Sequence, residues 1–283
     1  MNSIGGISFI IPCYREKAEV ILSTVTGLTA AMEGTVGFEI IVVNDGNDTE
    51  MFPDFSDERV VTIHHEINLG YGASLMSGIV ASNHEWIGIV DADGTYPVAH
   101  FKRFLEFVGK YDMVVGRRRL QDLPALRRLP KFFLLRLAGY IADHRIPDLN
   151  SGMRIFRKSI VMEYRRLFPK RFSFTTTITM ICFTNFFSVR FLDIPYYTRV
   201  GASSINPVGD TVKFFSLVLR LALYFKPLRF FIPLSGCALI AALARAIRDV
   251  VLTNHFGGLT LVLFFMGFQI FFFGLLAEII NKK

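Results

Sequence analysis

The 283-residue sequence is short of charged residues and of cysteine. Only 19% of its residues are charged and 52% are apolar, which excludes a disordered chain. The three cysteines, Cys13, Cys182 and Cys237, lie far apart, so we expect neither a Cys-x-x-Cys zinc site nor a disulfide framework. The N-terminal stretch has no Lys or Arg before its apolar run and soon reaches a proline, which predicts a first strand and not a signal peptide. We therefore expect the bulk of the chain to stay in the cytosol.

Several catalytic motifs are also absent. The sequence has no GxxxxGK[ST] loop, no HExxH and no GxSxG, which removes several classes of NTPase and hydrolase. The glycine turn at 70–72 begins like a dinucleotide-binding fingerprint, but Leu75 stands where the third glycine is needed, so an NAD enzyme is not expected. His64 and His65 would point to opposite faces of a strand, so we interpret them as ordinary strand-end residues.

The apolar excess lies mostly at the C-terminal end. Residues 228–252 and 258–280 form two apolar runs that can each cross a membrane, since about 20 helical residues suffice. Basic residues flank the two runs, which predicts that the outer ends of both are cytoplasmic; they are Lys226, Arg229, Lys282 and Lys283. Arg245 and Arg248, which would lie on the far side of the membrane, weaken this prediction, although Arg245 can pair with Asp249 at i+4.

A strongly basic stretch lies at 117–136, where seven basic residues stand against one acid, Asp122. Phenylalanines and leucines interleave with the charges, which predicts an amphipathic segment on an anionic membrane surface. A solvated basic face and nucleic-acid binding are the alternatives. Because the chain also has two apolar spans, we favour the membrane and expect no nucleic-acid partner.

Two further features concern the membrane region. Residues 210–226 predict a juxtamembrane helix in the interface, with Lys213, Ser216 and Arg220 on one side. Gln269 lies in the middle of the second span. It either hydrogen-bonds across helices and supports a homo-oligomer, or is a tolerated polar residue in a protein-facing position.

The first 226 residues alternate β-rich runs with helical stretches. We expect strands at 7–11, 39–43, 60–64, 86–90 and 112–115, and helices near 18–32, 73–82 and 99–109. This rhythm predicts an α/β fold with a mostly parallel sheet covered on both faces. Ligands bind beyond the carboxyl ends of such strands, and polar or glycine residues follow four of the predicted strands.

Asp91 and Asp93 directly follow the apolar run at 86–90. Residues two apart leave a strand on the same side, so both carboxylates can face one hard cation. Mg²⁺ typically takes one or two carboxylates plus substrate phosphates. A capped loop is the alternative, but the position after a buried strand favours a site.

The motifs occur in a recognisable order, which is IPCYRE, VVNDGNDT, NLGYGASLMSG, DADGTYP, DLNSGMRIF, FSFTTTITM and YYTRVGASSINPVGDTVKFF. Over nearly the whole chain they resemble family 2 glycosyltransferases of the polyprenyl-phosphate, dolichyl-phosphate mannose synthase-like type. The resemblance implies a cytosolic GT-A nucleotide-diphospho-sugar transferase domain at 1–208, a juxtamembrane helix at 209–226 and two transmembrane helices at 227–283. It implies inverting transfer of one sugar from a UDP- or GDP-sugar to polyprenyl phosphate, with Mg²⁺ or Mn²⁺.

The resemblance also implies roles for individual residues. The nucleotide-sugar would lie at Pro12, Tyr14, Glu16, Asn44, Asp45, Asn68, Gly70, Gly72 and Asp91. The metal would lie at Asp91 and Asp93, and the acceptor at Ser151, Gly152, Arg154 and Ser203. The expected catalytic residues are Asp93, Asp148, Arg117, Arg154 and Arg199. Asp148 is the candidate base or acceptor-positioning residue, and the three arginines can make forked contacts to phosphate. The alternatives are an ion pair with a nearby carboxylate for Arg154 and core packing for Tyr14.

The sequence departs from the family pattern at several positions. Asn44 replaces the first acid of an Asp-Asp pair, and Arg15 replaces the Asn of the opening motif. Thr95 stands where a Gln often assists the metal, and Ser204 stands where a Lys often follows Gly-x-Ser. The segment FSFTTTITM also lacks the Glu that many relatives have. The aspartates of the expected site remain, so we expect an active enzyme.

Other interpretations stay open. The chain can be a transferase acting on another lipid or glycan, or an inactive membrane scaffold. A processive polysaccharide synthase is disfavoured, because Gln121, Gln269 and Trp86 cannot build its Gln-x-x-Arg-Trp motif. We expect an integral protein of a bacterial inner membrane with a cytoplasmic catalytic domain.

Overall fold

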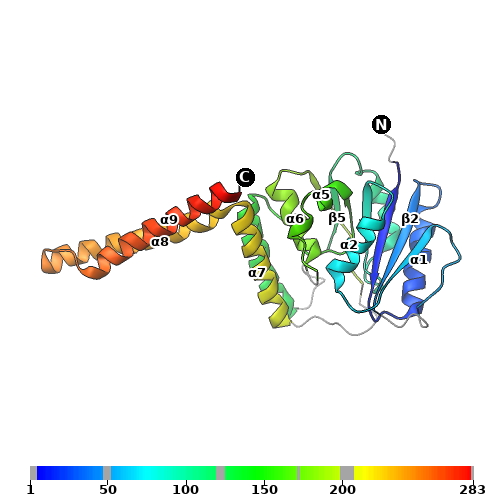
Figure 1. Ribbon diagram of the computed structural model, residues 1–283, viewed down its shortest axis with the longest axis horizontal. Helices are drawn as coiled ribbons and strands as arrows, with labels where there is room; N and C mark the ends of the chain where they lie inside the picture. Colours follow the sequence, from blue (N-terminus) through cyan, green and yellow to red (C-terminus); the bar gives the residue numbers. More distant parts are fainter. Residues whose placement is uncertain (1–4, 47–51, 119–124, 171–172, 198–206, 282–283) are drawn as a thin grey trace. The chain divides into compact units, whose positions relative to one another are not determined.

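The computed structural model describes residues 5–46, 52–118, 125–170, 173–197 and 207–281 (Figure 1). The chain divides into two compact units, residues 1–214 and 215–283. The division falls within α7 (Pro207–Phe225). The first unit contains an α/β domain and the second a helical hairpin. The domain boundaries expected at 208 and 226 stay predictions.

The first unit is built on a seven-stranded sheet in the order β3-β2-β1-β4-β6-β5-β7. Its strands are β1 (Ile7–Cys13), β2 (Phe38–Asp45), β3 (Val60–His65), β4 (Trp86–Ile89), β5 (Met113–Arg117), β6 (Arg154–Arg157) and β7 (Val189–Asp193). β1 pairs in parallel with β2 and β4, β2 with β3, and β5 with β7. β6 is antiparallel to both β4 and β5. The predicted mostly parallel sheet is confirmed, and β6 and β7 are additions to the predicted strands.

Helices cover both faces of the sheet, as Figure 1 shows. The helices between residues 18 and 184 are α1 (Ala18–Met32), α2 (Tyr71–Ala81), α3 (Phe101–Leu105), α4 (Ala125–Ala142), α5 (Lys158–Glu163) and α6 (Phe174–Thr184). Successive residues of β1 face opposite ways, because side chains alternate along a strand. Phe9 packs edge-on against Phe101 of α3, with ring centroids 4.9 Å apart. Ile10 lies on the other face against Gly78 of α2, where the absence of a side chain lets the helix approach.

Two predicted helices have different limits in the structure. The helix expected near 99–109 is a 3₁₀ turn (Val98–His100) followed by the short α3. The chain turns after Leu105 and passes through Gly109 at a φ of +84°, which a continuing helix does not allow. The helix expected at 73–82 begins earlier, at Tyr71, directly after Gly70 with its φ of +100°.

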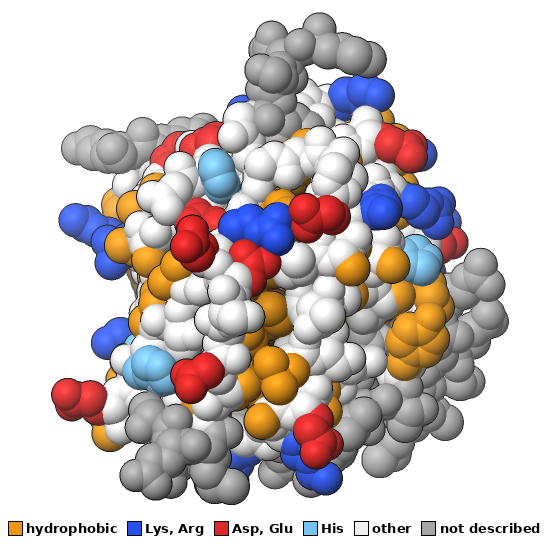
Figure 2. All heavy atoms as spheres, turned by 90° about the vertical axis from the view of Figure 1, so that its right-hand side faces the viewer, with side chains coloured by type: hydrophobic (Ala, Val, Ile, Leu, Met, Phe, Trp, Pro, Cys, Tyr) orange, Lys and Arg blue, Asp and Glu red, His pale blue; other side chains and the backbone are white. Residues whose placement is uncertain are grey.

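Figure 2 shows the end of the first unit that carries α1 and β2. Acidic and basic side chains are interspersed on this face, among scattered apolar ones. The basic stretch predicted at 117–136 falls on the end of β5 and on α4. Within it, residues 119–124 lie outside the described part of the chain, and side chains are described at Arg117, at Arg118 and from Lys131 onward.

The second unit contains α8 (Pro227–Thr253) and α9 (Gly258–Asn281), both long and apolar enough to cross a membrane. The Ser235 hydroxyl donates to the Gly267 carbonyl oxygen at 2.8 Å, which joins the two helices at a point where glycine permits close approach. At the turn between them, Asp249 accepts hydrogen bonds from Gly257 and Thr260. Its predicted ion pair with Arg245 is confirmed, at 3.1 Å. Gln269 lies on the exposed surface of α9.

Candidate active site

The residues predicted to bind the donor gather at one edge of the sheet. β1, β2 and β4 run in the same direction, so their carboxyl ends lie at the same edge. β1 is followed by Tyr14 and Glu16, β2 ends at Asp45, and Asp91 follows β4. The sheet topology therefore brings these segments together, as the sequence predicts.

Asp91 and Asp93 are held by different neighbours. The Tyr71 hydroxyl donates to Asp91 Oδ1 at 2.9 Å. Asp93 Oδ1 accepts from the Thr95 backbone N–H at 3.1 Å and from its hydroxyl at 2.6 Å. Burial and the negative charge of Asp93 raise the pKa of Asp91 well above its usual range. The two carboxylates therefore repel each other, and a bound cation would relieve this repulsion.

These two carboxylates fit a divalent cation that also binds a diphosphate. The described residues contain no group of three or more His, Cys, Asp or Glu placed to hold a metal by themselves. A Mg²⁺ ion that also binds a substrate phosphate needs only one or two carboxylates from the protein, because phosphate oxygens and water complete its coordination shell. Thr95, one of the positions expected to depart from the family pattern, hydrogen-bonds Asp93 and thereby fixes the orientation of this carboxylate.

Asp45 serves the loop that follows β3. Its carboxylate is 2% exposed and accepts hydrogen bonds from the backbone N–H groups of Leu69 and Gly70, at 2.9 and 2.8 Å. It also accepts from the Asn68 amide at 3.0 Å and contacts His65 Nδ1 at 2.8 Å. Because both oxygens already have partners, the Asp45 side chain supports the 68–70 loop from behind and does not itself present an open face to a nucleotide.

The loop after β1 is more open. Pro12 is buried within β1, whereas the Tyr14 side chain is 37% exposed, which excludes the alternative of simple core packing. The Glu16 carboxylate accepts a hydrogen bond from the Tyr14 backbone N–H. Arg15 has a φ of +67° and stacks over the Tyr14 ring at 4.9 Å. Asn is favoured in this left-handed conformation, so the Arg strains the backbone where the family motif has Asn.

Asn44 is fully buried, and its side-chain amide lies 3.1 Å from His64 Nδ1. At this departure from the family's Asp-Asp pair, the Asn44 amide therefore contacts an imidazole of the neighbouring strand. Like Asp45, Asn44 faces β3 and not an open surface. In this structure Asp45 binds the 68–70 loop and Asn44 contacts β3, and the donor-binding role expected of the two residues stays a prediction.

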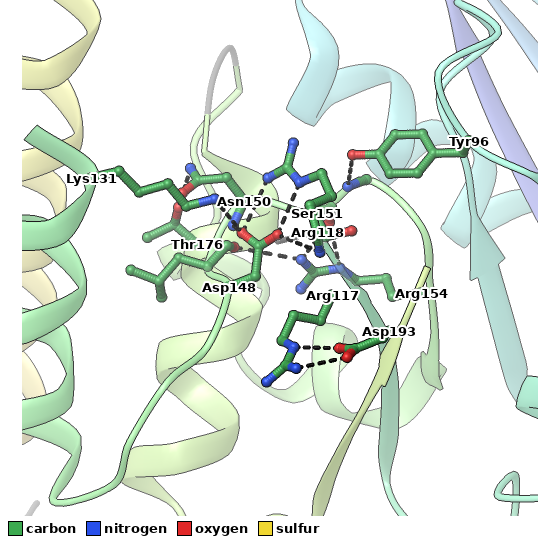
Figure 3. A network of polar contacts seen from close by, with 12 residues as sticks. Tyr96, Arg117, Arg118, Lys131, Asp148, Asn150, Ser151, Arg154, Thr176 and Asp193 are labelled. Carbon is green, nitrogen blue, oxygen red and sulfur yellow. Dashed lines mark hydrogen bonds and ion pairs between the residues drawn. The ribbon is translucent and has the colours of Figure 1, made fainter. Parts of the chain in front are cut away.

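Asp148 is fully buried in a cluster of positive charge (Figure 3). Arg118 donates to its two carboxylate oxygens at 2.9 and 3.1 Å, and Lys131 of α4 donates at 2.9 Å. Burial alone would raise the pKa of Asp148, but the charges of Arg118 and Lys131 outweigh burial and hold it far below its usual range. A carboxylate so strongly held is a poor proton acceptor, so the geometry favours a positioning role for Asp148, and its predicted role as a base stays a prediction.

Two neighbouring arginines at the end of β5 have different partners. Arg117 forms a bidentate ion pair with Asp193 at the end of β7, and both side chains are about 40% exposed. Arg118 is the one that binds Asp148, and it lies over the Tyr196 ring at 5.2 Å. The pKa of Asp91 is raised by burial and by Asp93, and the charge of Arg118 offsets part of this rise. Arg118, which is not among the predicted catalytic residues, is therefore the arginine that binds Asp148, and the phosphate contact expected of Arg117 stays a prediction.

Arg154 is fully buried at the start of β6. Its guanidinium donates to the carbonyl oxygens of Ser151, at 2.5 and 3.1 Å, and Thr175, at 3.0 Å, and to the Thr179 hydroxyl at 3.0 Å. Burial lowers the pKa of Arg154 to about 10. These bonds fasten the 149–151 loop to α6, and the partners of the guanidinium are neutral oxygens and not the carboxylate of the alternative ion pair. The forked phosphate contact expected of Arg154 stays a prediction.

The loop before β6 touches Asp91, one of the two carboxylates expected at the donor site. A Cβ atom on Gly152 would overlap the carboxylate of Asp91, so only glycine fits between the loop and this side chain. The Gly152 backbone N–H donates to the Tyr96 hydroxyl at 2.8 Å. Ser151 Oγ is buried, and no hydrogen-bond partner for it is found among the described residues. The expected acceptor loop and the expected donor site are therefore in direct contact.

Sequence reasoning missed four residues that the structure brings to this region: Tyr71, His65, Arg118 and Lys131. Arg118 and Lys131 belong to the basic stretch that predicts binding to a membrane surface, so their charges were assigned to the membrane and not to a buried carboxylate. Tyr71 lies in the glycine turn at 70–72, and its hydroxyl was the only feature in the sequence that could indicate a polar partner for it. The predicted residues Arg199 and Ser203, and the departure at Ser204, lie outside the described residues.

Two family models match the sequence of this chain. One, described as glycosyl transferase family 2, matches residues 8–165, which is more than half of the chain. The chain belongs to glycosyl transferase family 2. The second model, described as the GtrB C-terminal hairpin, matches residues 226–282 and covers α8 and α9. The resemblance inferred from the motifs and the GT-A-like α/β fold are both confirmed.

Relatives of this family 2 glycosyltransferase include lipid-phosphate enzymes. A dolichyl-phosphate hexose transferase of Haloferax volcanii is 23% identical over 186 residues, covering 62% of this chain and 81% of the relative. An undecaprenyl-phosphate 4-deoxy-4-formamido-L-arabinose transferase of Photorhabdus laumondii is 22% identical over 304 residues, covering 99% and 90%.

Solved structures of low sequence identity share the fold. Glucosyl-3-phosphoglycerate synthase from Mycobacterium tuberculosis, in complex with Mn²⁺, UDP and glucosyl-3-phosphoglycerate, superimposes with a TM-score of 0.54 at 13% identity. The match covers 76% of this chain and 79% of that chain. TarS 1-349 of S. aureus, in complex with UDP-GlcNAc, has a TM-score of 0.53 at 16% identity and covers 78% and 67%.

Proposed function

We propose that this family 2 glycosyltransferase transfers a single sugar, with inversion, from a nucleotide-diphospho-sugar to a polyprenyl phosphate. The dolichyl- and undecaprenyl-phosphate transferases among its relatives support the acceptor class. The UDP complexes among its structural neighbours support a UDP-linked donor, with a GDP-linked donor as the alternative.

The observation that carries this proposal is the charge of the cluster around Asp148. Two cations, Arg118 and Lys131, bind one buried carboxylate, and that carboxylate is too firmly ionised to take a proton. A sugar hydroxyl acceptor benefits from a base that removes its proton. A phosphate monoester has a second pKa near 6 and is already largely dianionic at pH 7. A site that offers positive charge in place of a base therefore suits a phosphate acceptor.

In the proposed reaction, an oxygen of the lipid phosphate attacks the anomeric carbon of the sugar. The bond from this carbon to the diphosphate breaks, and the nucleoside diphosphate leaves with the electron pair. The chain's own residues align the two reactants: the buried hydroxyl of Ser151 is free to donate to a bound phosphate, and Arg118 and Lys131 supply positive charge. Asp91 and Asp93 would hold Mg²⁺ or Mn²⁺, which supplies charge neutralisation at the leaving diphosphate.

The membrane is part of the proposal. α8 and α9 would anchor the chain, with the catalytic domain on the cytoplasmic side of a bacterial inner membrane. α4 exposes Phe132, Phe133 and Tyr140, whose exposed fractions are 45%, 63% and 52%, together with Arg136. An exposed face of aromatic and basic side chains is typical of helices that lie in the headgroup region. A homo-oligomer, with the exposed Gln269 at an interface between spans, is part of the same proposal.

The test is sugar transfer by the full-length protein in detergent. The donors are a panel of UDP- and GDP-sugars, and the acceptors are undecaprenyl phosphate, dolichyl phosphate and the same lipids as free alcohols. Asp93→Asn is run beside the parent, and Asp54→Asn, which removes a charge from an exposed residue, is the matched control.

We expect a lipid-linked product with the phosphate acceptors alone, made by the parent and by Asp54→Asn and lost in Asp93→Asn. A product formed equally well on the lipid alcohol would refute the argument that this site, which has no base, needs an acceptor that is already ionised. Binding of a nucleotide-sugar without transfer to any acceptor would favour the inactive scaffold.

A further inference from the structure

The glycine turn at 70–72 is not a dinucleotide-binding fingerprint, yet it lies beside Asp91, one of the two carboxylates expected at the donor site. It begins α2, and its central residue, Tyr71, donates its hydroxyl proton to Asp91 Oδ1 at 2.9 Å. A tyrosine hydroxyl has one proton to donate, and here the acceptor is this carboxylate oxygen.

The backbone on both sides of Tyr71 is fixed. On one side, the Asp45 carboxylate accepts hydrogen bonds from the N–H groups of Leu69 and Gly70. On the other side, Gly72 lies against the Pro169 carbonyl so closely that a Cβ atom would overlap it. The next residue in the helix donates its N–H to the Lys170 carbonyl at 2.6 Å. The tyrosine is therefore presented from a backbone that is held at both ends.

The second oxygen of Asp91 meets a different wall. The Gly152 backbone abuts Asp91 Oδ2, so the carboxylate lies between the Tyr71 hydroxyl and the loop before β6. A carboxylate confined in this way has few orientations left. Hydrogen bonds from outer residues commonly orient metal-ligating carboxylates, and losing one typically weakens metal binding or activity about 10–100-fold.

We propose that Tyr71 is a positioning residue, whose hydroxyl fixes the orientation of Asp91 for binding a divalent cation together with the donor diphosphate. The inference rests on the metal-dependent transfer proposed above. It assigns a role to the glycine turn: Asp45 holds the turn, the turn holds Tyr71, and Tyr71 holds Asp91.

The experiment measures Mn²⁺ binding directly. The full-length protein in detergent is titrated with Mn²⁺ in the presence of UDP, and free Mn²⁺ is followed by electron paramagnetic resonance. Tyr71→Phe removes a single oxygen atom. Tyr111→Phe removes the same atom from a partly buried ring that packs against Phe107 in the same unit, and is the matched control. Thermal unfolding of each variant checks the fold.

We expect Tyr71→Phe to weaken Mn²⁺ binding about 10-fold or more and Tyr111→Phe to bind like the parent. In an Asp91→Asn background, Tyr71→Phe should weaken binding less than twofold further, because the two residues act as one unit. Transfer assays with saturating donor should show the same order of variants as the Mn²⁺ titration.

Two results would overturn the inference. One is a folded Tyr71→Phe variant that binds Mn²⁺ as tightly as the parent. The other is an equally large loss from Tyr71→Phe whether or not Asp91 has been replaced, since this would show that Tyr71 acts elsewhere. Failure of the parent itself to bind Mn²⁺ with UDP is a separate outcome, which refutes the proposed use of metal.

Discussion

Replacing Asp148 by Asn is expected to lower stability far more than it changes acid–base chemistry. Asparagine keeps the shape of the side chain but leaves Arg118 and Lys131 facing a neutral amide in a site where their own side chains are only 11% and 12% exposed. Removing one partner of a buried ion pair costs about 3–5 kcal/mol. At about 2–4 °C per kcal/mol for a domain of this size, the lower value predicts a fall in Tm of about 6–12 °C.

The assay is thermal unfolding of full-length protein in detergent at pH 7, with Asp193→Asn as the matched control. Asp193 also pairs with an arginine, Arg117, but this pair is exposed to solvent, and such pairs contribute about 0–1 kcal/mol. The control variant should therefore unfold within about 4 °C of the parent.

The pH dependence of stability has a defined sign. Arg118 and Lys131 hold the pKa of folded Asp148 below the unfolded value of about 3.9. The stabilisation is therefore complete above about pH 4 and is lost as the pH falls through the folded pKa. The Tm difference between parent and Asp148→Asn should be constant from about pH 6 to 8 and should shrink below about pH 4.

A different result would refute this reasoning. If Asp148→Asn unfolds at the parent's temperature, and its transfer rate loses the limb of the pH profile that reports a base, then Asp148 is the base. In that case Arg118 and Lys131 would not keep Asp148 ionised in the active enzyme, and the argument for a phosphate acceptor would lose its support.

Three further predictions concern the loops and α4. Gly152→Ala should abolish transfer because its Cβ overlaps the Asp91 carboxylate, and Mn²⁺ binding with UDP, measured by titration, should weaken with it. Arg15→Asn should raise stability by about 1 kcal/mol, seen as a higher Tm, because Asn accepts the left-handed backbone more readily. Phe133→Trp should be quenched by brominated lipids in anionic bilayers, whereas Val61→Trp, at an exposed position of β3, should not; equal quenching of both would contradict docking of α4.

The sheet was predictable because its strands are short apolar runs with clear ends. Phe9 and Ile10 show the reason, since buried strands covered on both faces need apolar residues at every position. Asp91 and Asp93 could be placed at the carboxyl edge because they directly follow such a run. β6 was not predictable by the same means, because its four residues, Arg154–Arg157, begin and end with arginine.

Side-chain partners could not be read from the sequence. Arg117 and Arg118 are adjacent and chemically identical, and only the direction in which each leaves the end of β5 decides that one binds Asp193 and the other Asp148. Lys131 belongs to an amphipathic helix, and its contact with Asp148 depends on how that helix packs. Such choices depend on tertiary packing and not on local pattern.

The direction of β6 brings the loop before it to the same edge of the sheet as the loop after β4. A parallel strand would start at the far edge, but β6 runs against β4, with Arg154 opposite Ile89. The residues entering β6 therefore meet the residues leaving β4, and Gly152 comes to lie against Asp91. The β4–β6 register fixes this meeting point, so an inserted residue between Gly152 and Arg154 would separate the two loops.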